Sequence, residues 1–147
     1  MPRKRSKTTK KADSQARKRI VRSFFSLVMQ GRQKEGLRFF APNCRQHNPY
    51  VRGGMNALFD AMAAVQNEPP KFPDPHFAVK RVLADGDMVA VHVELFNSKS
   101  KPGEGGLRQV HLFRFGKGDK IIEYWDVTQM VGSDMPNAAN AFEEGKA

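Results

Sequence analysis

The hydrophobic positions in the first half of the chain recur with the period of an α-helix. Between Asp13 and Gly31, four apolar residues repeat at spacings of three and four, which predicts an amphipathic helix. They are Ile20, Phe24, Leu27 and Val28. Asp13 or Ser14 is suited to cap the start of this helix, and Gly31 to end it. A short second helix ending at Pro42 and a third helix over residues 54–66 are expected to follow.

The second half of the chain changes to the period of a β-strand. Alternating apolar and polar residues, rich in strand-forming types, predict four strands near residues 76–84, 87–97, 106–116 and 120–130. Asp85-Gly86 is a typical tight hairpin turn between the first two. A longer loop is expected from Asn97 to Gly106, and Gly116 to Asp119 closes the last hairpin. Before the strands, residues 43–49 are polar and end in Pro49, which predicts a short extended segment.

Helices followed by antiparallel strands are the order of an α+β domain. Four long strands need a cover for their apolar side, and only the preceding helices are available to supply it. We therefore expect N-terminal helices packed in a strongly curved antiparallel sheet, an α+β roll with a central pocket of the kind that binds small molecules. The domain should span residues 13–131, between a disordered basic tail over residues 1–12 and an irregular C-terminal tail over residues 132–147.

The net charge of +10 is concentrated at the N-terminus. Ten of the 25 Lys and Arg residues lie in residues 1–22, together with only one of the 15 Asp and Glu residues. Because the remaining body is nearly neutral, a basic face for nucleic acid is not expected on it. Contact with nucleic acid should be limited to non-specific binding by the tail, lost when residues 1–12 are removed.

The composition also disfavours several other classes of protein. Cys44 is the only cysteine, so neither an intrachain disulfide nor a cysteine-based zinc cluster can form. The four His residues lack metal-ligating spacing, and neither a metal nor an organic cofactor is expected. No apolar run is long enough to span a membrane, and no apolar segment typical of a secretory signal follows the basic start. We therefore expect a cytoplasmic protein.

The alternation of faces along the last strands indicates where chemistry could lie. The residues predicted to share one face of the final strand are Ile122, Tyr124, Asp126 and Thr128. His111 and Asp126 are equally far from the middle of the last turn, so they are expected to be cross-strand neighbours. An Asp facing an apolar pocket is a candidate general acid–base, because burial disfavours the charged form of a carboxyl group. The alternatives are that Asp126 pairs with an Arg or caps a loop, and that a strand histidine such as His92 is a core residue.

Three segments, in this order, resemble motifs of a known family. Gln46-His47-Asn48-Pro49 resembles a motif after its second helix, and Asp85 to His92 resembles its central hairpin. The segment from His111 to Asp126 resembles its closing hairpin, with an aromatic-Arg pair, a Gly-Lys turn, Ile-x-Glu and Trp-Asp. Over residues 16–131 the chain thus resembles the SnoaL-like polyketide cyclases of the NTF2-like superfamily, whose fold is a cystatin-like α+β roll.

The resemblance implies a cofactor-free enzyme of the aldol condensation or cyclase type, acting on a small apolar compound with a carbonyl group. In cyclases of this family, the Asp of the Trp-Asp motif is the acid–base of an intramolecular aldol closure, and a His on the neighbouring strand assists. These roles would fall to Asp126 and His111. The residues expected to bind the ligand in the pocket are His47, Asn48, His92 and Trp125. The resemblance also implies a homodimer that forms through the outer face of the sheet.

Other functions remain open on the same sequence. An isomerisation would use the same base, and an epoxide hydration would need an Asp-Arg-Asp arrangement that we cannot assemble from this sequence. A non-catalytic NTF2-like protein would bind a small ligand in the pocket, or a partner through its sheet. An Asp126 that is ion-paired and inaccessible would favour this binding role over catalysis.

Overall fold

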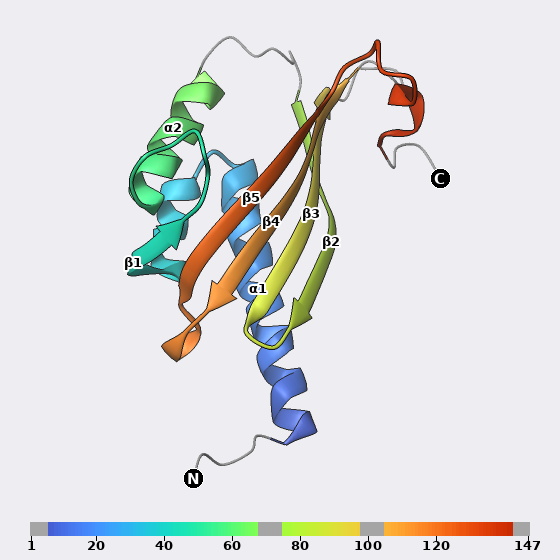
Figure 1. Ribbon diagram of the computed structural model, residues 1–147. Helices are drawn as coiled ribbons and strands as arrows, with labels where there is room; N and C mark the ends of the chain where they lie inside the picture. Colours follow the sequence, from blue (N-terminus) through green and yellow to red (C-terminus); the bar gives the residue numbers. More distant parts are fainter. Residues whose placement is uncertain (1–5, 68–74, 98–104, 143–147) are drawn as a thin grey trace.

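Helices from the N-terminal half cover one face of a five-stranded sheet (Figure 1). The structure is a computed structural model that describes residues 6–67, 75–97 and 105–142. The helices are α1 (Lys7–Met29), the 3-10 helix η1 (Gln33–Phe39) and α2 (Met55–Asn67), with short 3-10 helices η2 (Lys117–Asp119) and η3 (Ala138–Asn140). The strands are β1 (Phe40–Gln46), β2 (Pro75–Asp85), β3 (Met88–Asn97), β4 (Gly106–Phe115) and β5 (Ile121–Val131). These elements confirm the predicted α+β class and the four predicted strands.

The sheet is mixed rather than purely antiparallel, which corrects the prediction. Its strand order is β1-β5-β4-β3-β2, and β2 to β5 pair antiparallel, whereas β1 pairs with β5 in parallel. β1 occupies part of the segment that the sequence predicted to be merely extended. It contains Pro42, and only Phe40 and Cys44 are buried along it, so no alternation of apolar residues marks it as a strand.

The register of the last hairpin places His111 opposite Asp126, which confirms that prediction. A one-residue shift near the turn makes Ile122 the extra residue of a β-bulge. The bulge leaves Ile121 fully buried in the core and Ile122 39% exposed. The prediction that Ile122 shares the face of Asp126 is therefore wrong. The extra residue of the longer turn lies in the bulge, so the alternation of faces that includes Asp126 begins only after Ile122.

α1 begins at Lys7, earlier than predicted. Ser6 caps it, since its Oγ accepts a hydrogen bond from the backbone N–H of Thr9 at 3.2 Å. Residues 7–12, which the sequence predicted to be disordered, are therefore helical; their lysines and Ala favour a helix once a cap is present. The remainder of the predicted tail, residues 1–5, lies outside the described residues.

Arg17 anchors α1 to both hairpin turns at one end of the sheet. Its Nη1 donates to the carbonyl oxygen of Gly86 at 2.6 Å, and its Nε donates to Oδ1 of Asp119 at 3.2 Å. Gly86 has φ 58°, a conformation that favours glycine, and it forms the predicted turn between β2 and β3. One helix side chain thus holds the ends of two hairpins together.

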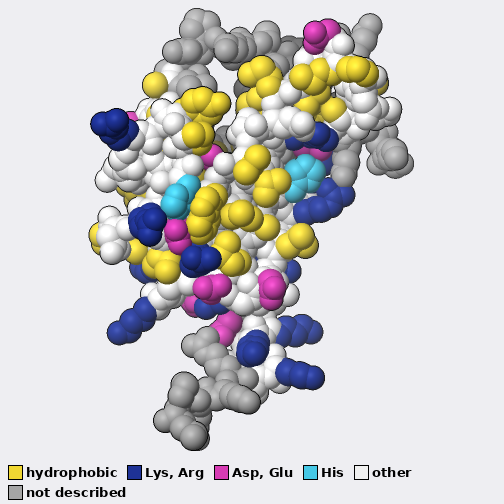
Figure 2. All heavy atoms as spheres, viewed as in Figure 1, with side chains coloured by type: hydrophobic (Ala, Val, Ile, Leu, Met, Phe, Trp, Pro, Cys, Tyr) yellow, Lys and Arg dark blue, Asp and Glu magenta, His cyan; other side chains and the backbone are white. Residues whose placement is uncertain are grey.

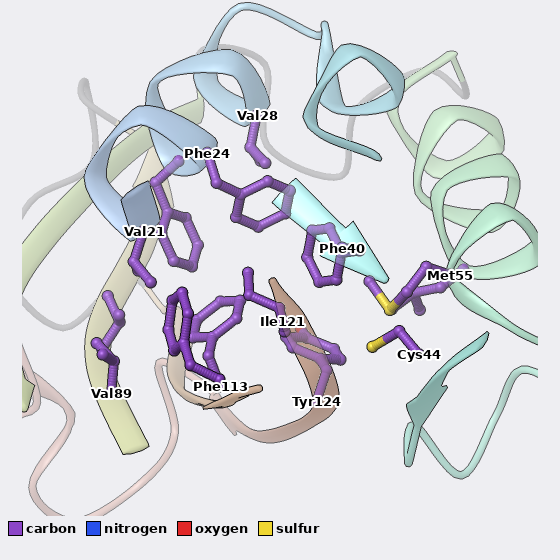
Figure 3. Close-up of a cluster of buried hydrophobic side chains, with 14 of the residues drawn as sticks. Val21, Phe24, Val28, Phe40, Cys44, Met55, Val89, Phe113, Ile121 and Tyr124 are labelled. Carbon is purple, nitrogen blue, oxygen red and sulfur yellow. The ribbon is translucent and has the colours of Figure 1, made fainter. Parts of the chain in front are cut away.

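The hydrophobic core lies between the helices and the inner face of the sheet (Figure 3). Phe24 of α1 is at its centre. The rings that pack around Phe24, at centroid distances of 5.3 to 5.9 Å, are those of Phe25, Phe40, Phe59 and Phe113. Because α1, β1, α2 and β4 each supply a ring, this aromatic cluster fixes the helices against the sheet and defines the inner wall of the molecule.

Two predicted segments fall partly outside the described residues. They are most of the loop between β3 and β4 (98–104) and the end of the C-terminal tail (143–147). Residues 68–74, between α2 and β2, also lie outside them. Residues 132–142 contain turns and η3. Among the helices that the structure describes, none is both long and apolar enough to cross a membrane.

Candidate functional site

A cavity of about 150 Å³ lies between the helices and the inner face of the sheet. Its apolar lining comes from α1, α2 and β2, and consists of Phe24, Phe25, Val28, Leu58, Phe59, Met62 and Phe77. Its polar lining comes from β4, β5 and the loop after β1, and consists of Asn48, Gln109, His111, Tyr124, Asp126 and Thr128. The cavity therefore has an apolar side and a hydrogen-bonding side, an arrangement typical of small-molecule sites.

Asp126 lies on the polar side and is held by neutral donors. The side-chain N–H group of Asn48 donates to both carboxylate oxygens, at 3.0 Å to Oδ1 and 2.9 Å to Oδ2. The hydroxyl group of Tyr124 donates to Oδ2 at 3.3 Å. Within the described part of the chain, no Lys or Arg forms an ion pair with Asp126. Its carboxylate is thus positioned by hydrogen bonds and not neutralised by a cation.

Tyr124 links Asp126 to His111. Its Oη lies 2.7 Å from Nδ1 of His111. Burial, the nearby charge of Asp126 and the hydrogen bond to that carboxylate raise the pKa of Tyr124 well above its usual value, so the hydroxyl keeps its proton. Since this single proton points to Asp126, His111 must donate its Nδ1–H to the tyrosine oxygen. The order of donation is therefore His111 to Tyr124 to Asp126.

His111 is buried and electrically neutral. Burial lowers its pKa from 6.5 to about 4, although the charge of Asp126 acts in the opposite direction. A neutral ring that donates through Nδ1 has no proton on Nε2, which lies 3.3 Å from the side-chain amide oxygen of Gln109. For Gln109 to hydrogen-bond to this nitrogen, its side-chain amide must turn its NH₂ group to Nε2 and its oxygen to the hydroxyl of Thr128. In that arrangement, His111 donates toward Tyr124 and not into the cavity.

The loop after β1 fixes the orientation of Asn48. Gln46 ties the loop together, because its Nε2 donates to the carbonyl oxygens of Val51 and Gly53 at 2.8 and 2.9 Å. Its Oε1 accepts the backbone N–H of Asn48 at 2.7 Å. The Oδ1 of Asn48 accepts the backbone N–H of Tyr50 at 2.9 Å. With its oxygen engaged in this way, Asn48 turns its NH₂ group toward the carboxylate on β5.

His47 and Trp125 form a separate cluster on the outer face of the sheet. Their rings stack at a centroid distance of 4.8 Å and an interplanar angle of 8°. His47 Nε2 donates to Glu123 at 2.9 Å, and Arg114 donates to the other oxygen of that carboxylate at 3.0 Å. The hydrogen bond from His47, followed by the charge of Arg114, holds the pKa of Glu123 below its usual range. These polar groups satisfy one another and do not line the cavity.

The structure corrects three of the four predicted ligand-binding positions. Asn48 lines the cavity, but His47, His92 and Trp125 do not. Val91 faces inward opposite His111, so the next residue, His92, points outward, where Arg81 donates to its Nδ1 at 3.0 Å. The physical reason is the two-residue period of a strand, because the motifs that suggested these residues do not by themselves distinguish the two faces.

Three polar cavity residues were not among the predicted site residues. Tyr124 and Thr128 share the inner face of β5 with Asp126, and Gln109 shares that of β4 with His111. The side-chain amide of Gln109 also hydrogen-bonds to the hydroxyl of Thr128 across the two strands, at 3.1 Å. Alternation of faces was the signal that could have found all three, since each lies two residues from a predicted catalytic residue.

The described residues give no support to a nucleophilic cysteine or a metal ion. Cys44 is buried in the core, and this burial, followed by the charge of Glu123, raises the pKa of its thiol to about 11. The thiol therefore stays protonated at neutral pH, unlike that of a nucleophilic cysteine. Among the described residues, no three His, Cys, Asp or Glu side chains converge in a way that would hold a metal ion.

Solved structures with the same fold carry several names. A candidate ketosteroid isomerase from Kribbella flavida has a TM-score of 0.61 at 19% identity, over 92% of this chain and 93% of its own. A candidate SnoaL-like polyketide cyclase from Jannaschia sp. has a TM-score of 0.60 at 20% identity, over 87% and 92%. A steroid delta-isomerase from Pseudomonas aeruginosa has a TM-score of 0.55 at 16% identity, over 80% of each chain. At such identities, the likeness shows the fold alone.

Sequence comparison identifies the family. No curated protein sequence matches the chain. The model of the SnoaL-like domain matches residues 21–124, which include Asn48, His111 and Tyr124 and end just before Asp126. Because this match covers well over half of the 147 residues, the chain belongs to the SnoaL-like domain family.

Proposed function

We propose that the protein is a cofactor-free enzyme that abstracts a proton next to the carbonyl group of a small apolar compound, in a reaction of the aldol condensation or cyclase type. The observation that carries this proposal is the placement of Asp126. Its carboxylate lines a cavity with a large apolar side, has no ion pair among the described residues, and is oriented by Asn48 and Tyr124. A carboxylate in this setting can act as a general base toward a carbon acid.

In the proposed reaction, a carboxylate oxygen of Asp126 removes the proton from the carbon beside the carbonyl group. The electron pair of the broken C–H bond moves to the carbonyl oxygen and forms an enolate. Asn48 can donate to this oxygen, since its NH₂ group already points to the place where Asp126 acts. The enolate carbon then forms a C–C bond with a second carbonyl group. The new alkoxide receives the proton back from Asp126, so that the enzyme returns to its starting state.

His111 has a positioning role in this proposal. The resemblance gave His111 the role of assisting Asp126. The hydrogen-bond order favours Asn48 as the donor to the oxyanion, because His111 directs its proton to Tyr124. His111 then acts through Tyr124, whose hydroxyl fixes one oxygen of Asp126 and leaves the carboxylate aimed at the cavity.

The test is the exchange of carbon-bound hydrogen in D₂O. Acetophenone is a suitable probe, because its methyl protons lie next to a carbonyl group and their replacement by deuterium is visible by NMR. The protein should accelerate this exchange, and Asp126→Asn, which keeps the shape and loses the base, should lower the rate by about 10²–10⁴-fold. Asp87→Asn is the matched control, since Asp87 is an exposed carboxylate outside the cavity.

Two results would contradict the enzyme proposal. The first is a wild-type protein that binds acetophenone without accelerating exchange, which favours the non-catalytic ligand-binding alternative. The second is an Asp126→Asn variant with full activity. An isomerisation begins with the same proton abstraction, so it would pass this test and be recognised by the product formed from an unsaturated ketone.

We further propose that the protein is a homodimer that pairs through the outer face of the sheet. Hydrophobic side chains gather on this face over the strands (Figure 2). Leu83, Val110 and Val127 point outward there and are 62%, 41% and 62% exposed. Exposed apolar residues grouped on one face are typical of an interaction surface.

A further inference from the structure

We infer that the substrate is a single-ring or similarly small carbonyl compound, and that ketones with several fused rings are excluded by size. This inference rests on the proposed function for the carbonyl group, but its size argument comes from the cavity alone. It separates this protein from structural relatives that are named for steroids or polyketides.

The volume of the cavity sets the size of the ligand. Pockets for drug-sized molecules commonly measure roughly 300–1,000 Å³. The cavity here measures about 150 Å³. An apolar cavity of about 150 Å³ in another protein holds one benzene molecule. A ring with a short carbonyl-bearing substituent is therefore near the upper limit of what the cavity accepts.

The aromatic wall makes this limit firm. Phe24 stacks on Phe59 at a centroid distance of 5.6 Å, and Phe25 stacks on Phe77 at 5.9 Å, both with interplanar angles of 27°. Phe24, Phe25 and Phe59 are at most 3% exposed, so these rings have protein on all other sides. Enlarging the cavity on the side of these three rings would require the core itself to move, which close packing resists.

The distribution of polar groups sets the chemistry of the ligand. The groups able to hydrogen-bond come from β4, β5 and Asn48, whereas α1, α2 and β2 contribute only apolar side chains. Asp126 and Thr128 are two residues apart on β5, so the polar strip is roughly 7 Å long. Such a cavity suits a flat apolar body with one carbonyl edge, and its described lining has no hydrogen-bonding side chain on the opposite edge.

Phe77 is the best position at which to test the size limit. It lines the cavity from β2, at the edge of the sheet, and it is only partly buried, so its ring can be removed with little loss of the core. Met62 of α2 offers a second, independent site, since it is also partly buried and lines the same cavity. Met29→Ala, at an exposed position at the end of α1 and outside the cavity, is the matched control.

The experiment measures the affinity of the full-length protein for three ketones of increasing size by ligand-observed NMR. These probes are acetophenone with one ring, 1-tetralone with two and androst-4-ene-3,17-dione with four. The wild-type protein should bind acetophenone at least 10-fold more tightly than 1-tetralone, and show no saturable binding of the steroid. Phe77→Ala or Met62→Ala should reduce the difference between the first two ketones to less than 3-fold, whereas Met29→Ala should preserve it.

The outcomes separate this inference from the proposed function. Wild-type protein that binds the steroid as tightly as acetophenone, or that does not bind acetophenone, overturns the size inference. Unchanged selectivity in folded Phe77→Ala and Met62→Ala proteins also overturns it. Selective binding of acetophenone without hydrogen exchange contradicts the enzyme proposal and leaves the size inference standing. Accelerated hydrogen exchange on the steroid supports the enzyme proposal and overturns the size inference.

Discussion

Tyr124 makes the site a connected unit at the scale of single residues. His111 and Asp126 are cross-strand partners, yet the hydrogen bonds between them pass through the tyrosine hydroxyl. Because His111 is neutral and Tyr124 remains protonated, the imidazole N–H donates to the tyrosine oxygen and the tyrosine O–H donates to Asp126. The protonation state of one buried imidazole therefore decides how the carboxylate is held.

The first residue-scale prediction concerns stability at acidic pH. In the folded protein, burial lowers the pKa of His111 from 6.5 to about 4. Between these values the unfolded chain binds a proton that the folded protein does not, so the free energy of unfolding falls as the pH falls through this window. The contribution is on the order of 3 kcal/mol, and it is present above pH 6.5 and lost at pH 4.

Urea unfolding at pH 7 and pH 4 measures this contribution. Other groups also titrate over the range, so the informative quantity is the difference between the wild-type protein and His111→Asn. The variant keeps a donor near Tyr124 but has no group to titrate, and should lose less stability between the two pH values. An equal loss in both proteins would show that the fold does not lower the pKa of His111.

At the scale of elements, η1 depends on one close approach to α1. A Cβ atom at Gly36 would lie 2.7 Å from Cδ2 of Phe24, a ring at the centre of the core and on the cavity wall. Gly36→Ala should therefore destabilise the protein by about 1–3 kcal/mol through overpacking. Gly54→Ala is the control, because an added methyl group there meets nothing within 4 Å.

Chemical denaturation of the two glycine variants compares these effects. Gly36→Ala should lower the midpoint clearly, and Gly54→Ala should lower it less. If both variants unfold like the wild-type protein, η1 is not packed against Phe24 as described.

Elements with a regular side-chain period were predictable from the sequence, and the rest were not. β2 to β5 alternate apolar and polar residues because one face is buried, so their positions and the pairing of His111 with Asp126 followed from the sequence. β1 was not predicted as a strand, because it is an edge strand that contains Pro42 and buries few side chains, so no alternation of apolar residues marks it. The early start of α1 depends on the cap at Ser6. This cap was not predicted, because Ser6 lies in a basic segment whose composition indicates disorder.

The candidate site was predictable only as far as the faces of the strands were followed. Asp126, His111 and Asn48 lie in the cavity as predicted. His47 was assigned to the pocket through its motif, although its neighbour Asn48 is the residue that points inward. The two-residue period had already placed Tyr124 on the face of Asp126. Choosing the site residues by this period, and not by the motifs, would have moved His92 and Trp125 to the outer face and added Tyr124 to the site.

At the scale of the whole molecule, the outer face predicts how two copies associate. If the homodimer forms there, Val127→Glu places a charge in the middle of an apolar interface, and the variant should be monomeric at concentrations where the wild-type protein is dimeric. Sedimentation velocity measures both states. Met29→Glu, at an exposed position at the end of α1, should remain dimeric. A monomeric wild-type protein would contradict the dimer.

The contacts that close the cavity join distant parts of the chain, and this bears on how the protein is made. Asn48 and Asp126 are 78 residues apart, and Arg17 and Asp119 are 102 apart. At roughly 5–20 residues per second, a ribosome needs about 4–16 s to travel from the first of these site residues to the second. During that interval the sheet that covers the phenylalanines of α1 is still incomplete. The nascent chain should therefore be a client of chaperones that shield apolar segments until the last hairpin emerges.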